Sequence, residues 1–511
     1  MQKQLSRPLA ILALFALAAC GGGGGNGGSI PNTPTQPTGL TGVIVGVGDS
    51  LTAGYQAGGL LGAFPVTNPV SALPGGLVPP TQENGFWGLL YAQAKGLPTS
   101  ALGGPNSPLP LINGPGLGDQ LVFAAAPPFF APTHSSCDAF NQAAFSQSGL
   151  STVRINQSSA VYDVAVPGQT AHEALYQINP ITGPPNGPGC SFTPNPNDPT
   201  AGGLQSLIAG ESGLFLPILG GFANQSSPPN PFTQVNAAVS LHPTLATVWL
   251  GANDLLKYTF SGGNPAASDS PGQMQADITL AIQKLQGSGA KVVVANLPDI
   301  LGLPQFFAQP ALPQTIATFT GGQVPAAAVQ GLVLPYLQSA YGIGAGGYLT
   351  ETGFFGLLGN IGPVITALSH GQTPPPFLDP NGKGSGLGGA YLTDQLAAQV
   401  QGLNTAYNAS IGAAATATGA PLVDIHSLFV QIKTAGGVPI NPPKCCSLQF
   451  GGGILSFDGL HPSNTGYALI ANAFIDTINA KLGGSIPDVN VGAIYSGAAS
   501  FQNIPDPYAQ H

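Results

Sequence analysis

Charged residues are scarce in this sequence. Only 6% of its 511 residues are charged, and 11 lysines and arginines stand against 20 aspartates and glutamates. A protein with so few cations lacks the basic surface that nucleic-acid binding requires, so we expect no nucleic-acid partner. Hydrophobic residues make up 43% of the chain, which argues against disorder even though 74 glycines and 51 prolines are present. We therefore expect a large buried core with many turn-rich loops.

Cysteine is also scarce, with five residues: Cys20, Cys137, Cys190, Cys445 and Cys446. No CxxC pair occurs, and no group of histidines and carboxylates has the spacing of metal ligands, so the sequence predicts no metal and no cofactor. In an exported protein, the four cysteines after Cys20 allow three disulfide connectivities. We favour a pairing of Cys137 with Cys190, because it joins two Pro/Gly-rich stretches. Cys445 and Cys446 could pair with each other only as a strained vicinal bridge.

The N-terminal hydrophobic run, Leu9 to Ala19, is too short to cross a bilayer and follows two basic residues, which is typical of a signal peptide. It ends in "LAAC", which resembles the lipobox of bacterial lipoproteins. That resemblance implies removal of residues 1–19 and lipidation of Cys20; the alternative is an ordinary signal peptide with a chance cysteine. The Gly/Pro-rich stretch 20–40 favours a tether. We expect an exported lipoprotein, held at the outer membrane or cell surface by its lipid.

Short apolar runs predict five buried strands, at residues 42–50, 160–168, 245–254, 290–298 and 420–429. The runs are continuously apolar rather than alternating, which favours a parallel sheet covered on both faces. Helical periodicity appears in residues 274–285, 392–411 and 469–482. The alternation predicts an α/β fold, a three-layer α/β/α sandwich with a mainly parallel five-stranded sheet.

Two long Gly/Pro-rich insertions, at residues 56–159 and 301–389, interrupt a domain that spans residues 41–483, ahead of a C-terminal tail at 484–511. Connections of this length tend to be lids or binding loops. We expect their aromatic residues to be exposed and to bind an acyl chain, although they could instead close a small satellite core. These aromatic residues are Phe129, Phe130, Phe306, Phe307, Phe354 and Phe355.

The segment "VGVGDSLTAGY" places Ser50 where a predicted strand turns into a helix. Serine at a helix start is commonly an N-cap. A phosphate-binding loop is disfavoured, because no Lys-Ser/Thr pair follows Gly48. The remaining interpretation is a nucleophile exposed at the end of a strand. Thr52 stands where the Gly-x-Ser-x-Gly motif has its second glycine, which argues against an α/β-hydrolase.

Other polar or glycine positions converge with Ser50. Ligands of doubly wound sheets bind at the carboxyl ends of the strands. Gly168 and Asn253 end the second and third predicted strands, and Asp458 and His461 directly precede the last helix. The pattern predicts one site at this edge of the sheet.

The blocks "GDSLTAG", the Gly168 segment, "GAND" and Asp-x-x-His together resemble the SGNH (GDSL-type) hydrolases, whose sheet is flavodoxin-like. The resemblance implies Ser50 as nucleophile with His461 and Asp458 as partners. It also implies an oxyanion hole made by the backbone N–H groups of Ser50 and Gly168 and the Asn253 amide. The implied protein is a serine esterase or lipase that acts through an acyl-enzyme. A carbohydrate acetylesterase of the same family and a non-catalytic surface-binding lipoprotein remain alternatives.

Overall fold

The computed structural model describes residues 39–62, 80–114, 116–118, 121–123, 130–132, 153–157, 159–176, 217–219, 233–378, 389–440 and 446–496. The predicted signal peptide, Cys20 and nearly all of the tether lie outside these ranges, as do Cys137, Cys190 and Cys445. Cys446 is disulfide-bonded.

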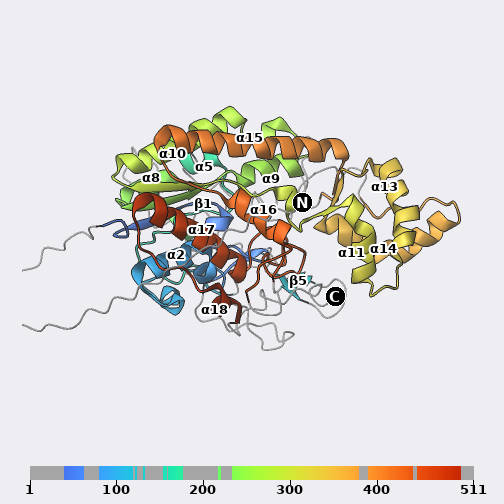
Figure 1. Cartoon of the computed structure of the whole chain (residues 1–511), viewed down its shortest axis with the longest axis horizontal. Coiled ribbons are helices and arrows are strands. Elements are labelled where there is room, and N and C mark those ends of the chain that lie inside the picture. Colours follow the sequence, from blue (N-terminus) through green and yellow to red (C-terminus); the bar gives the residue numbers. More distant parts are fainter. Residues whose placement is uncertain are drawn as a thin grey trace, which may run out of the picture. The chain divides into compact units, whose positions relative to one another are not determined.

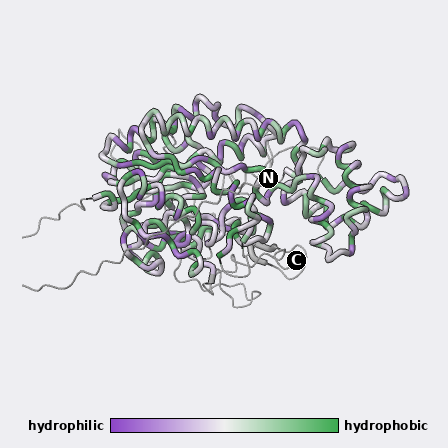
Figure 2. Tube along the Cα trace, in the orientation of Figure 1, coloured by the Kyte–Doolittle hydropathy of each residue, from purple (hydrophilic) through white to green (hydrophobic). Residues whose placement is uncertain are grey.

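A parallel sheet forms the centre of the fold, in the strand order β1-β6-β7-β11 (Figure 1). Its strands are β1 Ile44–Gly48, β6 Leu245–Trp249, β7 Lys291–Ala295 and β11 Leu422–Val423. Every residue of β1 and β6 is buried, as continuous apolar runs predict for strands covered on both faces. Figure 2 shows hydrophobic residues along these strands. The predicted α/β sandwich with a mainly parallel sheet is confirmed.

The predicted strand at 160–168 does not form a regular strand. It runs parallel to β1, where Val164 N donates to Gly46 O at 3.0 Å and Val166 N to Gly48 O at 3.2 Å, but only Gly46 and Asp163 form a bridge. The sheet therefore has four strands rather than the five that we predicted, and this segment lies along its β1 edge.

Helices pack in two groups on opposite sides of the sheet (Figure 1). One group comprises α5 Ala171–Tyr176, α8 Gln234–Ser240, α9 Ala252–Phe260, α10 Pro271–Gly287 and α15 Asp394–Thr418. The other comprises α2 Phe86–Lys95, α16 Ile425–Ala435, α17 Asn464–Leu482 and α18 Val491–Ser496. The three helices predicted from periodicity are confirmed as α10, α15 and α17.

Local sequence signals mark the starts of α10, α15 and α17 and the end of α17. The side chain of Ser463 accepts a hydrogen bond from Gly466 N and caps the start of α17, while Gly483 ends the helix at a φ of 73°. Thr393 caps α15 and Ser270 caps α10 in the same way. These three helices therefore begin at capping residues of their own sequence.

The second insertion is folded, which corrects the expectation of a long loop. It contains helices α11 Leu312–Phe319, α12 Ala326–Ala328, α13 Leu334–Tyr341 and α14 Glu351–Ser369, and a π-helical turn at Val329–Val333. A small antiparallel sheet joins β8 Phe306–Ala308, β9 Tyr348–Thr350 and β10 Tyr391–Leu392. These elements enclose a second hydrophobic core.

The aromatic residues of this insertion close that core. Phe354 is fully buried and stacks on Phe307, with ring centroids 4.0 Å apart. The satellite-core alternative therefore describes these two rings, and the expectation that they are exposed is wrong. Glycine and proline within these helices weaken the sequence signal for a helix. Pro363 lies inside α14, and Gly353 is needed there because a Cβ at this position would meet the Ala390 carbonyl oxygen. Phe129 and the side chain of Phe130 lie outside what the structure describes.

Within the described residues, α14 is the one helix long and apolar enough to cross a membrane by length and composition alone. Its buried face in the second core consists of Phe354, Leu357, Ile361 and Val364.

The remaining short elements are α1 Ser50–Ala53, β2 Gly59–Leu60, β3 Leu117–Gly118, β4 Leu121–Phe123 and β5 Phe130–Pro132.

Candidate active site

Ser50 is the first residue of α1, and one residue, Asp49, separates it from the end of β1. The helix is capped by Asp49, whose Oδ1 accepts a hydrogen bond from Leu51 N at 2.9 Å. Ser50 is therefore not the N-cap. The turn is tight, because a Cβ on Gly48 would lie 2.0 Å from Thr52 Oγ1. Burial raises the pKa of the Asp49 carboxyl to about 7.

The hydroxyl of Ser50 is bound to His461. Ser50 Oγ lies 2.8 Å from His461 Nε2, and His461 Nδ1 lies 2.8 Å from Asp458 Oδ2. Ser50 and His461 are 6% and 8% exposed, so the hydroxyl and the ring are shielded from bulk water. The ring of His461 also contacts the ring of Tyr55, with centroids 4.8 Å apart. The structure thus joins three residues that the sequence singled out into one hydrogen-bonded chain.

The carboxylate of Asp458 is held by backbone amides on both oxygens. Oδ2 accepts from Gly58 N at 2.8 Å, and Oδ1 accepts from Leu460 N at 3.0 Å and His461 N at 2.8 Å. Burial raises the pKa of this carboxyl, but the adjacent His461 and these amides outweigh it and leave the pKa below its usual range. Asp458 is therefore a fixed negative charge beside the imidazole.

Asn253 lies in the first turn of α9 and is 8% exposed. Its Nδ2 donates to the carbonyl of Gln169 at 3.2 Å, which joins α9 to the loop that contains Gly168. Gly168 has a φ of 83°, a conformation that favours glycine. The structure therefore brings Asn253 to the Gly168 loop, and Asn253 lines a small cavity together with Ser50 and His461.

Gln234 supports this arrangement and was not singled out from the sequence. It is fully buried, accepts from Gly48 N at 2.9 Å, and donates to Gly48 O at 2.8 Å and to Gln169 Oε1 at 2.7 Å. One amide thus ties the end of β1 to the Gly168 loop. The partners lie 186 and 65 positions away, so no local pattern could have identified the residue.

The second insertion contacts the loop that carries Asp458. The side-chain amide of Gln305, with its nitrogen facing two acceptors, donates to Glu351 Oε2 at 2.8 Å and to the Asp458 carbonyl at 2.7 Å. Burial, and then the charge of Asp458, raise the pKa of Glu351 to about 8. Glu351 is therefore mostly neutral at neutral pH, although it lies near Asp458. The sequence patterns did not reveal Glu351.

Two largely apolar cavities are relevant to this site. The cavity at Ser50 measures about 40 Å³, and the second, lined by the insertion and by residues within 432–450, measures about 650 Å³. Leu303 lines both. Apolar residues of the smaller cavity include Leu256, Leu297, Ile300, Phe429 and Leu460.

Residues 44–341 and 350–474 match the family model described as GDSL-like Lipase/Acylhydrolase. The chain belongs to this family. The match begins in β1 and ends within α17, so it includes the Ser50 turn, α9 and the Asp458–His461 loop. No curated protein shows significant similarity to the chain. The GDSL-like hydrolase family comprises acyl hydrolases of esterase and lipase type, and this protein is a serine hydrolase that acts on ester bonds.

Proposed function

We propose that Ser50 is the nucleophile of this hydrolase, His461 its general base and Asp458 the group that orients the imidazole. The hydrogen-bonded chain from Ser50 Oγ through His461 to Asp458 Oδ2 carries this proposal. A serine hydroxyl becomes an effective nucleophile when an imidazole accepts its proton, and a carboxylate on Nδ1 fixes the tautomer that leaves Nε2 as acceptor.

The reaction then proceeds in two steps. Ser50 Oγ bonds to the ester carbonyl carbon while its proton moves to His461 Nε2, and the alcohol leaves after taking that proton. Water next attacks the acyl-enzyme, giving its proton to His461, and the Ser50–acyl bond breaks as Ser50 Oγ regains the proton. The fixed charge of Asp458 stabilises the imidazolium present in both steps.

The oxyanion of each tetrahedral intermediate needs donors that are already in place. We assign these to the backbone N–H groups of Ser50 and Gly168 and to Asn253 Nδ2. Two observations support the assignment: Ser50 opens α1, and Asn253 lies against the Gly168 loop while lining the cavity at Ser50. Each donor of this kind is typically worth ~3 kcal/mol of transition-state stabilisation.

The substrate we propose is an ester with an apolar acyl group, which is a lipase-like preference. The apolar side chains around the cavity at Ser50 support it, as does the larger cavity beyond Leu303. One observation favours the acetylesterase alternative, because about 40 Å³ beside Ser50 accommodates only a short acyl group unless Leu303 moves.

A chain-length series of p-nitrophenyl esters tests this function. Ser50→Ala should abolish hydrolysis of every ester while the protein stays folded, and activity at the parent level would overturn the nucleophile assignment. Leu303→Trp should lower the ratio of kcat/KM for octanoyl esters to kcat/KM for acetyl esters. The expected decrease is about fourfold for each methylene that is no longer buried. Leu97→Trp, at an exposed leucine, is the matched control. A parent enzyme that prefers acetyl esters would favour the acetylesterase.

We also propose that the hydrolase is a lipoprotein held at the outer membrane or cell surface through Cys20. The "LAAC" motif and the Gly/Pro-rich segment that follows it support this location. Cys20→Ser should move the protein from the membrane fraction to the soluble fraction with unchanged kcat/KM. A protein that sediments with membranes equally well without Cys20 would contradict the proposal.

A further inference from the structure

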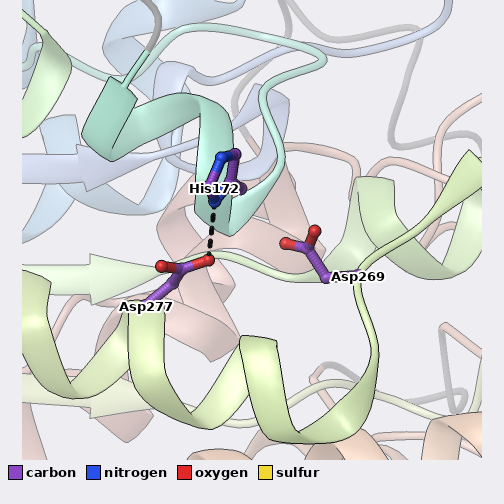
Figure 3. A group of neighbouring side chains, drawn as sticks. All are labelled: His172, Asp269 and Asp277. Carbon is purple, nitrogen blue, oxygen red and sulfur yellow. Dashed lines mark hydrogen bonds and ion pairs between the residues drawn. The ribbon is translucent and has the colours of Figure 1, made fainter.

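A histidine and two aspartates from separate parts of the chain meet at the side of the sheet where α5 and α10 pack. His172 lies in α5, Asp277 in α10, and Asp269 in the segment before α10 (Figure 3). Their donor atoms all lie within 4.8 Å of one another, and His172 Nδ1 is 3.1 Å from Asp277 Oδ2. The side chains point toward a common space in Figure 3. We propose that these three residues bind a divalent transition-metal cation of the zinc class.

The carboxylates at this place are under-satisfied. Asp269 Oδ2 is buried and accepts no hydrogen bond from a described amide or hydroxyl group, and its carboxyl contacts that of the fully buried Asp254. A buried carboxylate oxygen without a donor costs free energy, and a bound cation removes that cost.

The positively charged side chain nearby, Lys257, already forms an ion pair with another residue. Lys257 Nζ contacts both carboxylate oxygens of Glu173, at 2.9 and 3.0 Å. The amide of Gln273 donates to Asp277 Oδ2 at 3.0 Å, but an amide brings no charge. Two carboxyl groups, those of Asp269 and Asp277, therefore lie beside one histidine, a balance that favours a cation.

The donor set selects the kind of metal. Zinc binds imidazole nitrogen and carboxylate oxygen at roughly 2.0–2.2 Å, which puts tetrahedral ligands about 3.4 Å apart. The 3.1 Å between His172 Nδ1 and Asp277 Oδ2 is close to that spacing, and a carboxylate oxygen of Asp269, within 4.8 Å of both atoms, would move toward the ion on binding. Calcium and magnesium prefer oxygen ligands alone, so the imidazole disfavours them.

The position of the cluster gives the cation a structural role. His172 follows Gly168 by one short loop, and Asp254 follows Asn253 and accepts from Ala171 N at 3.1 Å. A cation here would tie the Gly168 loop to α10 without touching the ester. The sequence predicted no metal because positions 172, 269 and 277 form no ligand motif, and only the packing of α5 on α10 brings them together.

Calorimetric titration of the purified, tag-free and chelator-treated full-length protein with ZnCl₂ tests the proposal. The parent should bind one zinc ion per chain, and its melting temperature should rise by about 3 °C at a hundredfold excess over Kd. His172→Ala, at a side chain that is 48% exposed, and the double variant Asp269→Asn/Asp277→Asn should each lose that binding.

Asp476→Asn/Asp488→Asn is the matched control, because it removes two neighbouring carboxylates elsewhere in the chain and should leave binding unchanged. A parent that binds no zinc would overturn the proposal. So would zinc binding that survives in folded His172→Ala with unchanged affinity. Substrate hydrolysis is not needed for either result, so the test is independent of the assignment of Ser50.

Discussion

Phe354→Ala should destabilise the protein without changing its acyl-chain preference. The ring is fully buried at the start of α14, stacks on Phe307 at 4.0 Å and 7°, and meets Phe319 edge-on at 5.2 Å. Exposing a phenylalanine side chain costs about 1.5–3 kcal/mol, and each lost aromatic pair adds about 0.5–1.5 kcal/mol. Together with the cavity left behind, the expected loss in the free energy of unfolding is about 3–5 kcal/mol.

Thermal unfolding followed by circular dichroism measures this loss. For a chain of this size that unfolds as one unit, 3–5 kcal/mol corresponds to a fall in Tm of about 3–5 °C. Phe354 lines neither the cavity at Ser50 nor the larger cavity of the insertion within the described part of the chain. The ratio of octanoyl to acetyl hydrolysis, measured well below Tm, should therefore stay within about twofold of the parent ratio.

Phe355→Ala is the control, since the neighbouring ring is only half-buried and should cost less stability. The reasoning would be refuted if Phe354→Ala kept the parent Tm while octanoyl hydrolysis fell relative to acetyl hydrolysis. That outcome would place the ring in contact with the acyl chain instead of in the second core.

Two further predictions concern the site. Asn253→Ala should lower kcat about a hundredfold with a smaller change in KM, because an oxyanion donor acts mainly in the transition state. Steady-state kinetics with p-nitrophenyl acetate measures both constants. A change confined to KM would show that Asn253 is not an oxyanion donor. For Glu351, a pKa raised from 4.5 to about 8 means that the folded protein keeps a proton that the unfolded chain releases. Parent stability should therefore fall between about pH 4.5 and 8, and Glu351→Gln should gain in Tm over the parent across that window; a difference independent of pH would contradict this.

Much of the fold follows from local sequence. The runs around Val47, Val248 and Val293 form parallel strands because continuously apolar segments suit a sheet covered on both faces. The helices α10, α15 and α17 follow from periodicity and from capping residues such as Ser463. The prediction of a regular strand at 160–168 was wrong. The segment is apolar, but it forms only a single bridge with β1, and an apolar run does not reveal how many backbone pairs a segment makes.

The candidate site was predictable for the same reason. Ser50 and Asn253 lie in the first turn of a helix that follows a strand, and Asp458 and His461 lie shortly before α17. Parallel strands bring such positions to one edge of a sheet. Two residues separate Asp458 from His461, so one loop places carboxylate and imidazole in contact. Sequence by itself therefore determined the fold class and the positions from which the catalytic chemistry is proposed to come.

Tertiary structure alone decided what surrounds that site. Gln234 braces the end of β1, Gln305 joins Glu351 to the Asp458 loop, and His172 meets Asp277 across 105 positions of sequence. Such contacts depend on how distant segments pack, and the local sequence around a polar side chain does not indicate which residue it will contact. The insertion was misjudged for a related reason: its glycines and prolines weaken helical periodicity, and burial of aromatic rings such as Phe354 in a common core stabilises the helices instead.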